Sequence, residues 1–413
     1  MDRRSFLISA GSSTAFAFSA ALGLPALAQI PKKPPRGGGP LDLASYGGGP
    51  DSPDNVEPFE QAFEHLVASG GGTLMISGPG RYRFSRGCRE LGIAADIGID
   101  VRWGPGVRFI GPDGLKTPLL RFRGSAGPER IGALQLFNPS IDVSQGAYTG
   151  NQPSAIHLFN LATVVIEHPR LFGGRTWTNA AVGGDSGIEP TNIGDFRCFG
   201  GSIEGFADAG IYWGGGNDPS PVDDGLRMLV EGTTVRHCQT GVIGKRNGHL
   251  GIVRDCHIEH CGIGVATAEA GRGQEQDSAQ RLDIQGCNIK YSSFRGVEFR
   301  GKTIGKIVGN TIEDWGYTED GETLLPRQNQ RCAVFLNGSN DIDVSGNIIR
   351  MNDWPSNGHI GIVESNYLSQ TGRLFVGGGN YGRENTFVNV SVPVVSGSTS
   401  LRRSLFHSLN QKR

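Results

Sequence analysis

The chain contains 413 residues, including 65 glycines, and its 39 basic residues nearly balance its 40 acidic ones, so the net charge is −1. This balance excludes the strongly basic surface that a nucleic-acid-binding protein presents. The high glycine content comes without a Gly-X-Y period, which excludes collagen and indicates many turns.

The first 28 residues predict an export signal. The pair Arg3-Arg4 precedes an apolar stretch at 8–24, and Ala26-Leu27-Ala28 follows. This order resembles a twin-arginine signal with its cleavage site. A membrane anchor is the alternative, but the stretch is rich in small residues and leads into a Pro/Gly linker at 29–40. We therefore expect a periplasmic or secreted protein without membrane contact after signal removal.

Residues 41–90 predict a cap for the strands that follow. An acidic turn at 51–55 leads into apolar residues with helical spacing between Phe59 and Leu66, and glycines at 70–72 end that helix. A strand, a turn and a second strand are expected within 73–84. A helix with such a pair covers the open end of a strand stack and protects its edge.

From residue 134 onward one short phrase returns eight times: two apolar residues on alternate positions, a small or turn-favouring residue, and another apolar residue. The first copy is Leu134–Ile141, and the small residues recur at intervals of 23 to 37 residues. A second marker, a small residue before a β-branched one, runs in phase, as in Gly187-Ile188. These periods predict one all-β domain, a parallel β-helix over residues 41–390, with a tail at 391–413.

The N-terminal part resembles a known family. The resemblance lies in the order Asp42-x-x-x-Tyr46-Gly47, an acidic turn, a short helix, Gly71-Gly72-Thr73 and Gly78-Pro79-Gly80-x-Tyr82. This order is similar to the start of the pectate-lyase-like superfamily of right-handed parallel β-helices. With the repeats, the resemblance covers residues 41–390. It implies a right-handed, single-stranded solenoid that cleaves or epimerises polysaccharides, although such a fold hosts several reactions.

The motifs that would fix the reaction match only in fragments. Polygalacturonase-like members carry paired aspartates and a Gly-His-Gly on successive coils. This chain offers Asn217-Asp218, Asp223-Asp224 and Asn247-Gly248-His249 instead. The resemblance therefore transfers no catalytic aspartate to this sequence.

A cluster at Cys256–Cys261 has two cysteines and two histidines, but its spacing differs from the paired two-residue gaps of zinc sites. Two residue pairs lie 23 apart, one repeat interval, and are predicted to stack on neighbouring coils: His237 with His260, and Cys238 with Cys261. A second column, predicted to point inward as a ladder, contains Cys256, Cys287, Asn310 and Asn347. We expect no metal here, and the odd number of seven cysteines leaves at least one thiol unpaired.

The repeat register predicts which outward side chains meet, because neighbouring coils lie about 4.8 Å apart. One outward column includes His157, Glu189, Tyr212 and Glu298. Glu189 and Glu298 are four coils apart, roughly 19 Å by this spacing, which is too far for a hydrolytic pair.

The first hypothesis is a glycoside hydrolase, which needs two carboxylates about 5 to 9.5 Å apart. Asp185 and Asp208 fall in one column on adjacent coils, where repulsion favours keeping one of them protonated as a general acid. The alternative is that both are turn residues that bond their own backbone. The candidate catalytic residues are Asp185, Glu189, Asp208 and Asp224. The candidate sugar-binding residues beside them are His157, Trp177, Tyr212 and Trp213.

The second hypothesis is a polysaccharide lyase or C5-epimerase acting on a uronate-containing polymer. Such an enzyme needs a base and positive charge, or calcium, beside the uronate carboxylate. The basic candidates near one loop-bearing edge are Lys245, Arg246, His249 and Arg300. The third hypothesis is a non-catalytic glycan-binding β-helix. We expect a polysaccharide or oligosaccharide partner, no cofactor other than calcium in a lyase, and side-by-side association, for example as a trimer.

Overall fold

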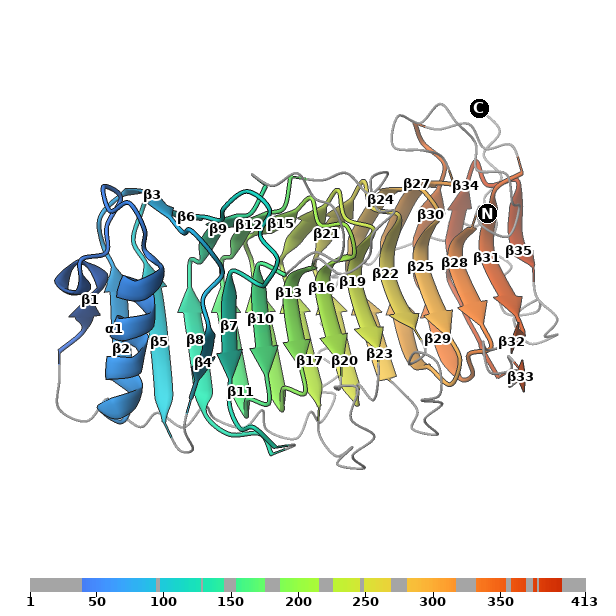
Figure 1. Cartoon of the computed structure of the whole chain (residues 1–413). Helices are drawn as coiled ribbons and strands as arrows, with labels where there is room; N and C mark the ends of the chain where they lie inside the picture. Colours follow the sequence, from blue (N-terminus) through green and yellow to red (C-terminus); the bar gives the residue numbers. More distant parts are fainter. Residues whose placement is uncertain are drawn as a thin grey trace, which may run out of the picture. The chain divides into compact units, whose positions relative to one another are not determined.

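Successive coils of the chain contribute strands to three parallel sheets, called A, B and C here (Figure 1). The computed structural model describes residues 39–93, 97–127, 129–144, 154–174, 186–214, 226–245, 249–268, 281–316, 332–353, 358–368, 374–376 and 379–395. These residues belong to one unit, Lys33–Arg413. Within them each sheet has eleven strands, and each strand pairs with its equivalent in the next coil.

The strands of the three sheets are short. Sheet A contains β1 (Leu41–Asp42), β2 (Gly72–Ile76), β5 (Gly98–Trp103), β8 (Ala133–Phe137), β11 (Thr163–Glu167), β14 (Asp195–Phe199), β17 (Arg227–Glu231), β20 (Leu250–Arg254), β23 (Arg281–Gln285), β26 (Ile304–Val308) and β29 (Ile342–Ser345). Sheet B contains β3 (Gly80–Arg83), β6 (Val107–Ile110), β9 (Ser140–Asp142), β12 (Arg170–Phe172), β15 (Ser202–Glu204), β18 (Thr234–Arg236), β21 (His257–Glu259), β24 (Asn288–Ser292), β27 (Thr311–Trp315), β30 (Ile348–Arg350) and β34 (Thr386–Val388). Sheet C contains β4 (Glu90–Gly92), β7 (Leu120–Arg123), β10 (Ile156–Phe159), β13 (Ser186–Thr191), β16 (Ala209–Gly214), β19 (Thr240–Lys245), β22 (Ile263–Ala268), β25 (Arg295–Arg300), β28 (Cys332–Asn337), β31 (Ile360–Ser365) and β35 (Val392–Val395). A separate antiparallel pair is formed by β32 (Tyr367–Leu368) and β33 (Leu374–Phe375).

Side chains alternate between the core and the outside along each strand, which explains why these segments are extended. In β14, Phe196 and Cys198 are fully buried, whereas Asp195 and Arg197 face outward as an ion pair with an oxygen–nitrogen distance of 2.5 Å. Phe196 pairs in register with Val164 of β11 on the preceding coil. The parallel β-helix predicted from the repeats is confirmed, and so is the right-handed winding that the family resemblance implies.

The inward side chains form one continuous hydrophobic core along the coils. Its largest members, such as Trp213, Trp315 and Phe196, are fully buried. Burying an aliphatic or phenylalanine side chain contributes roughly 1.5–3 kcal/mol. Because each coil buries its inner face only against its neighbours, stability comes from stacking rather than from any single strand.

A residue in the left-handed region makes the corner between sheets A and B in many coils. Asn138, His168 and Asp255 have φ values of 55°, 50° and 52°. Glycine takes the equivalent place in other coils, for example Gly232 with φ of 62°. This conformation costs little for glycine and is tolerated by Asn and Asp, so it allows a short corner.

The inward ladder predicted beside this corner is present. The backbone N–H of Cys287 donates to Oδ1 of Asn310 over 2.9 Å, and Nδ2 of Asn310 donates to Oδ1 of Asn347 over 3.0 Å. Asn347 in turn donates to Oδ1 of Asn385 over 2.9 Å. The ladder satisfies buried backbone groups that the corner removes from the sheets.

The histidine and cysteine pairs stack on neighbouring coils, as the register predicted. The rings of His237 and His260 are 5.2 Å apart and 12° from parallel, and the His260 ring stacks on Tyr291 at 4.8 Å. Cys238 and Cys261 are fully buried thiols. In the part of the chain that the structure describes, no group of three or more His, Cys, Asp or Glu side chains is placed to hold a metal ion.

The predicted capping helix is α1 (Val56–Ala68), which follows the short 3-10 helix η1 (Leu43–Tyr46) and lies at the N-terminal end of the described coils (Figure 1). Phe59 and Phe63 contact the rings of Phe109 and Phe122, at 5.6 Å and 5.3 Å. Asp54 Oδ1 accepts a hydrogen bond from the first helical N–H over 3.1 Å. The helix therefore closes the first coil with aromatic side chains.

At the other end sheet C continues to Val395, because β35 pairs with β31. This strand extends the β-helix five residues past the boundary predicted at 390. No helix in the described ranges is long and apolar enough to cross a membrane.

Candidate functional site

The outer face of sheet C brings Arg121, His157, Glu189 and Tyr212 onto four neighbouring strands. Arg121 of β7 pairs in register with His157 of β10, and His157 pairs with Glu189 of β13. The pairing of Ile188 with Ile211 places Tyr212 of β16 beside Glu189. Neighbours in this column are about 4.8 Å apart along the stack. A guanidinium, an imidazole, a carboxylate and a phenol therefore lie in one row.

Glu189 is a partly exposed carboxylate in this row. Its side chain keeps 28% of its exposure. Oε2 accepts a hydrogen bond from the Ser154 hydroxyl over 2.7 Å, and Oε1 lies 3.8 Å from Nε2 of His157. The carboxylate is thus oriented by a neighbouring coil while it stays reachable from outside.

His157 is largely buried beside Glu189. Its ring lies 3.9 Å from the ring of Phe159, and no hydrogen-bond partner is found for Nε2 among the described residues. Burial, with a smaller effect of the Arg121 guanidinium, lowers the pKa of His157 to about 3. The imidazole is therefore neutral near pH 7 and adds no positive charge beside Glu189.

Lys245 lies above the ring of Tyr212, on the strand that follows. Its Nζ is 4.7 Å from the ring centroid. Both side chains are half-buried, and the tyrosine ring packs against Ile243 and Ala266. This contact adds a positive charge to the row, next to a phenol and one strand further from Glu189.

Glu298 lies in the same column but is neutralised by two arginines. Only 1% of its side chain is exposed, Arg295 Nη1 is 2.5 Å from Oε2, and Arg300 Nε binds Oε1. The register through β16, β19 and β22 places Glu298 four strands from Glu189. Arg300, expected to bind substrate, is therefore engaged by a buried carboxylate.

A second carboxylate for hydrolysis is not found close to Glu189 within the described ranges. Asp208 lies four residues before Tyr212, the neighbour of Glu189 on β16. Four residues span roughly 13 Å along the strand direction, so Asp208 is at least that far from the position of Glu189. Glu90 is three strands away and forms ion pairs with Arg121 and Arg123 at 3.3 Å and 2.9 Å. Both lie beyond the separation of about 9.5 Å that two-carboxylate hydrolysis allows.

The other predicted site residues fall in three groups. Asp185, Asp224, Trp177 and Arg246 lie outside the described residues. His249 is exposed just before β20, on the edge that follows Lys245. The prediction that Trp213 binds sugar is wrong, because its indole is fully buried. Adjacent residues of a strand face opposite sides, so an outward Tyr212 turns Trp213 into the core.

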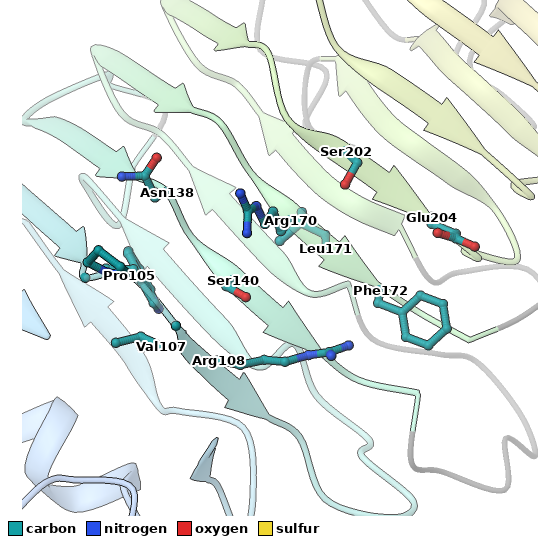
Figure 2. Close-up of a pocket in the computed structure, with 13 residues that line it drawn as sticks. Pro105, Val107, Arg108, Asn138, Ser140, Arg170, Leu171, Phe172, Ser202 and Glu204 are labelled. Atoms are coloured by element: carbon teal, nitrogen blue, oxygen red, sulfur yellow. The ribbon is translucent and has the colours of Figure 1, made fainter. Parts of the chain in front are cut away.

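A groove of about 650 Å³ on sheet B is a feature that sequence reasoning missed (Figure 2). The outward side chains that line it come from four strands and include Arg108, Ser140, Arg170, Phe172, Ser202 and Glu204. The signal was available in the register, because these residues occupy the two outward positions of the short strand that follows each A–B corner. The search for paired carboxylates did not lead to these residues, because the described residues that line the groove include no pair of carboxylates in one column.

Similarity to known proteins is structural. The sequence matches no known family profile and no curated protein sequence. The A-module of the Azotobacter vinelandii mannuronan C-5 epimerase AlgE4 has a TM-score of 0.55 and 13% identity, with 87% of this chain and 98% of that chain covered. The AlgE6 A-module has a TM-score of 0.52 and 14% identity, with 87% and 97% covered. The Dettilon tailspike protein has a TM-score of 0.57 and 13% identity, with 84% and 62% covered.

These similarities agree with the three parallel sheets of this chain and show a right-handed parallel β-helix fold. On this fold, the outer face of sheet C brings together a carboxylate, a phenol and an ammonium group, which are residue types that can take part in proton transfer on an anionic substrate. Calcium, expected for a lyase, takes about six to eight oxygen ligands. Within the described residues, no three His, Cys, Asp or Glu side chains are grouped to hold a metal ion.

Proposed function

We propose that this chain is an enzyme acting on a uronate-containing polysaccharide at the outer face of sheet C. One observation carries the proposal: Glu189 lies on the strand next to Tyr212, whose ring is 4.7 Å from Lys245 Nζ. The two neighbours named as mannuronan C-5 epimerases support proton transfer at a sugar C5.

In the proposed reaction ionised Glu189 accepts the proton on C5, beside the uronate carboxylate. The Lys245 ammonium balances the charge that develops on this carboxylate. In a lyase, the electrons of the C5–H bond form a C4–C5 double bond, the C4–O4 bond breaks, and Tyr212 protonates the leaving oxygen. In an epimerase, Tyr212 instead delivers a proton to the opposite face of C5. Each route regenerates the side chains by proton exchange with water.

Glycoside hydrolysis is the second candidate. It is favoured by the partial exposure of Glu189 and by the Ser154 hydroxyl that orients it. The second carboxylate that hydrolysis needs would come from Asp185 or Asp224, outside the described ranges, or from Asp208 after a movement of its corner. Non-catalytic glycan binding is the outcome if no polymer is altered.

The cellular setting is part of the same proposal. The twin-arginine resemblance supports a periplasmic or secreted enzyme, where polysaccharides are accessible. Side-by-side association, for example as a trimer, is proposed as the working state and is testable by light scattering.

The test is a panel of uronate-containing and neutral polysaccharides, with product masses and C5 configuration measured by mass spectrometry and NMR. Elimination gives products lighter by one water than hydrolysis products, and epimerisation changes configuration without a change in mass. We expect a C5-centred change on a polyuronate. Hydrolysis products, or no change in any polymer, would overturn the assignment in favour of the second or third hypothesis.

A further inference from the structure

We propose that the groove on sheet B is a second saccharide site, which binds an anionic sugar through Arg170. The groove lies on β6, β9, β12 and β15, away from the row that contains Glu189 on sheet C. Its ligand is a segment of a polymer whose sugars carry carboxylates. This choice of polymer rests on the proposed function, but binding is measured independently of catalysis.

Arg170 supplies the positive charge of this site. Its side chain is exposed, and its guanidinium makes no ion pair or hydrogen bond in the described structure. It is flanked in register by Ser140 on β9 and Ser202 on β15 (Figure 2). A guanidinium between two hydroxyls presents a bidentate partner for a carboxylate and hydrogen-bonding groups for the sugar hydroxyls beside it.

The other charges of the groove already have partners. Arg108 Nη2 is 2.8 Å from Oδ2 of the buried Asp142, and Arg236 Nε is 2.9 Å from Oε2 of Glu204. These pairs leave Arg170 as the guanidinium, among the described lining residues, that is available to a ligand. The site therefore has one unneutralised positive charge, which favours an anionic sugar over a neutral one.

Phe172 supplies the apolar surface that sugar rings need. It lies two residues beyond Arg170 on the same strand, so both side chains face outward, and it is half-buried between the positions of Asp142 and Glu204. The C–H face of a pyranose packs on an aromatic ring, while its carboxylate reaches Arg170. Two residues span about 6.6 Å, which is close to the width of one sugar ring.

The groove and the candidate active site share coils. β9, β12 and β15 each continue along the chain into β10, β13 and β16, which contain His157, Glu189 and Tyr212. The two surfaces lie on different sheets, so a polymer held at Arg170 does not occupy the position of Glu189. The groove thus acts as a holding site that raises the local concentration of polymer at the enzyme.

Calorimetric titration of the Glu189→Gln protein with a pure oligouronate tests the inference. We expect two saccharides bound per chain, and Arg170→Gln in that background weakens one of the two sites about tenfold or more. The matched control is Arg81→Gln, an exposed arginine in the same column of sheet B outside the groove. Phe172→Ala is expected to weaken the same site as Arg170→Gln.

Two further ligands test which chemical group of the saccharide the Arg170 site recognises. A neutral oligosaccharide of equal length should bind only the site that Arg170→Gln leaves unchanged, or not at all. A sulfated oligosaccharide that binds more tightly than the oligouronate would identify sulfate as the anion at Arg170. Equal binding by the Arg170→Gln and Arg81→Gln proteins, or equal affinity for neutral and anionic sugars, would overturn the site. An Arg170-dependent site on a protein that alters no polymer would keep this inference and reject the proposed function.

Discussion

Nε2 of His157 lies 3.8 Å from Oε1 of Glu189, on the neighbouring strand of sheet C. Because burial keeps this imidazole neutral, the contact does not neutralise the carboxylate. The Ser154 hydroxyl orients the other carboxylate oxygen. Glu189 is therefore an oriented carboxylate on an outer face, which is the placement that the proposed general base needs.

Glu189→Gln is expected to lower kcat on the responsive polymer by about 10²- to 10⁴-fold, because the amide cannot accept the proton. The matched control is Glu167→Gln on the outer face of sheet A, which should keep wild-type activity. Thermal unfolding of both variants checks that the fold is intact. Wild-type kcat in the Glu189→Gln protein would contradict the assigned role.

Tyr212→Phe keeps the ring beneath Lys245 and removes only the phenol hydroxyl. We expect kcat to fall by about 10²-fold with little change in KM, since the hydroxyl acts in the transition state and the cation–π contact is retained. Steady-state kinetics on the same polymer measure this separation. Tyr381→Phe, an exposed tyrosine elsewhere, is the control. A rise in KM at unchanged kcat would assign Tyr212 to binding alone.

Lys245→Met tests the charge beside the phenol. Methionine has similar length without the ammonium, so we expect weaker binding and slower turnover on an anionic polymer and a reduced dependence on salt. The activity of wild type and variant is compared across ionic strengths. An identical salt dependence in both proteins would remove Lys245 from substrate recognition.

Acid should destabilise the protein through His157. The folded pKa of about 3 lies below the ordinary value of 6.5, so the unfolded chain binds the proton more readily. The stabilising contribution is complete above pH 6.5 and is lost as the pH falls towards 3, by up to about 4 kcal/mol. Urea unfolding of wild type and His157→Gln at pH 7 and pH 4.5 isolates this group. An equal loss of stability in both proteins would show that His157 is not the cause.

The ladder should matter for stability and not for chemistry. Asn310 accepts from the Cys287 N–H and donates to the Ile284 carbonyl over 2.9 Å and 3.0 Å, both in the core. Asn310→Ala leaves these groups unsatisfied and should cost roughly 2–4 kcal/mol in the free energy of unfolding. Asn288→Ala, on the outer side of β24, should change it by less than about 0.5 kcal/mol. Chemical denaturation measures the free energy of unfolding of both variants, and an equal change in the two would contradict the role of the ladder.

Much of the fold was predictable because one spacing governs it. Period-two alternation and the repeat intervals fix which residues share a column, so the row His157, Glu189, Tyr212 and the ladder at Asn310 followed from the sequence alone. The stacking of His237 on His260 followed in the same way. In a repeat fold, residues at equivalent positions of successive coils are neighbours in space, so a pattern found within one coil predicts contacts between residues far apart in the sequence.

The chemistry of the sites was less predictable, since it depends on which charged side chains neutralise one another. The sequence does not show that Glu298 engages Arg300, or that Arg170 keeps an open guanidinium while Arg108 is held by Asp142. Rotamers choose between such partners, and spacing does not encode them. Trp213 shows a second limit. It directly follows the outward Tyr212, and adjacent residues of a strand face opposite sides, so its side chain lies in the core and not on the sugar-binding face.

Hydrogen exchange at C5 is the most direct test of the central claim. The enzyme is incubated with an unlabelled polyuronate in deuterated buffer. NMR follows deuterium that enters C5, and ultraviolet absorbance follows the C4–C5 double bond that forms when the C5 hydrogen is lost. The account predicts C5-centred change with wild type and none with Glu189→Gln. Cleavage with the C5–H bond intact, or C5 exchange undiminished in Glu189→Gln, would contradict it.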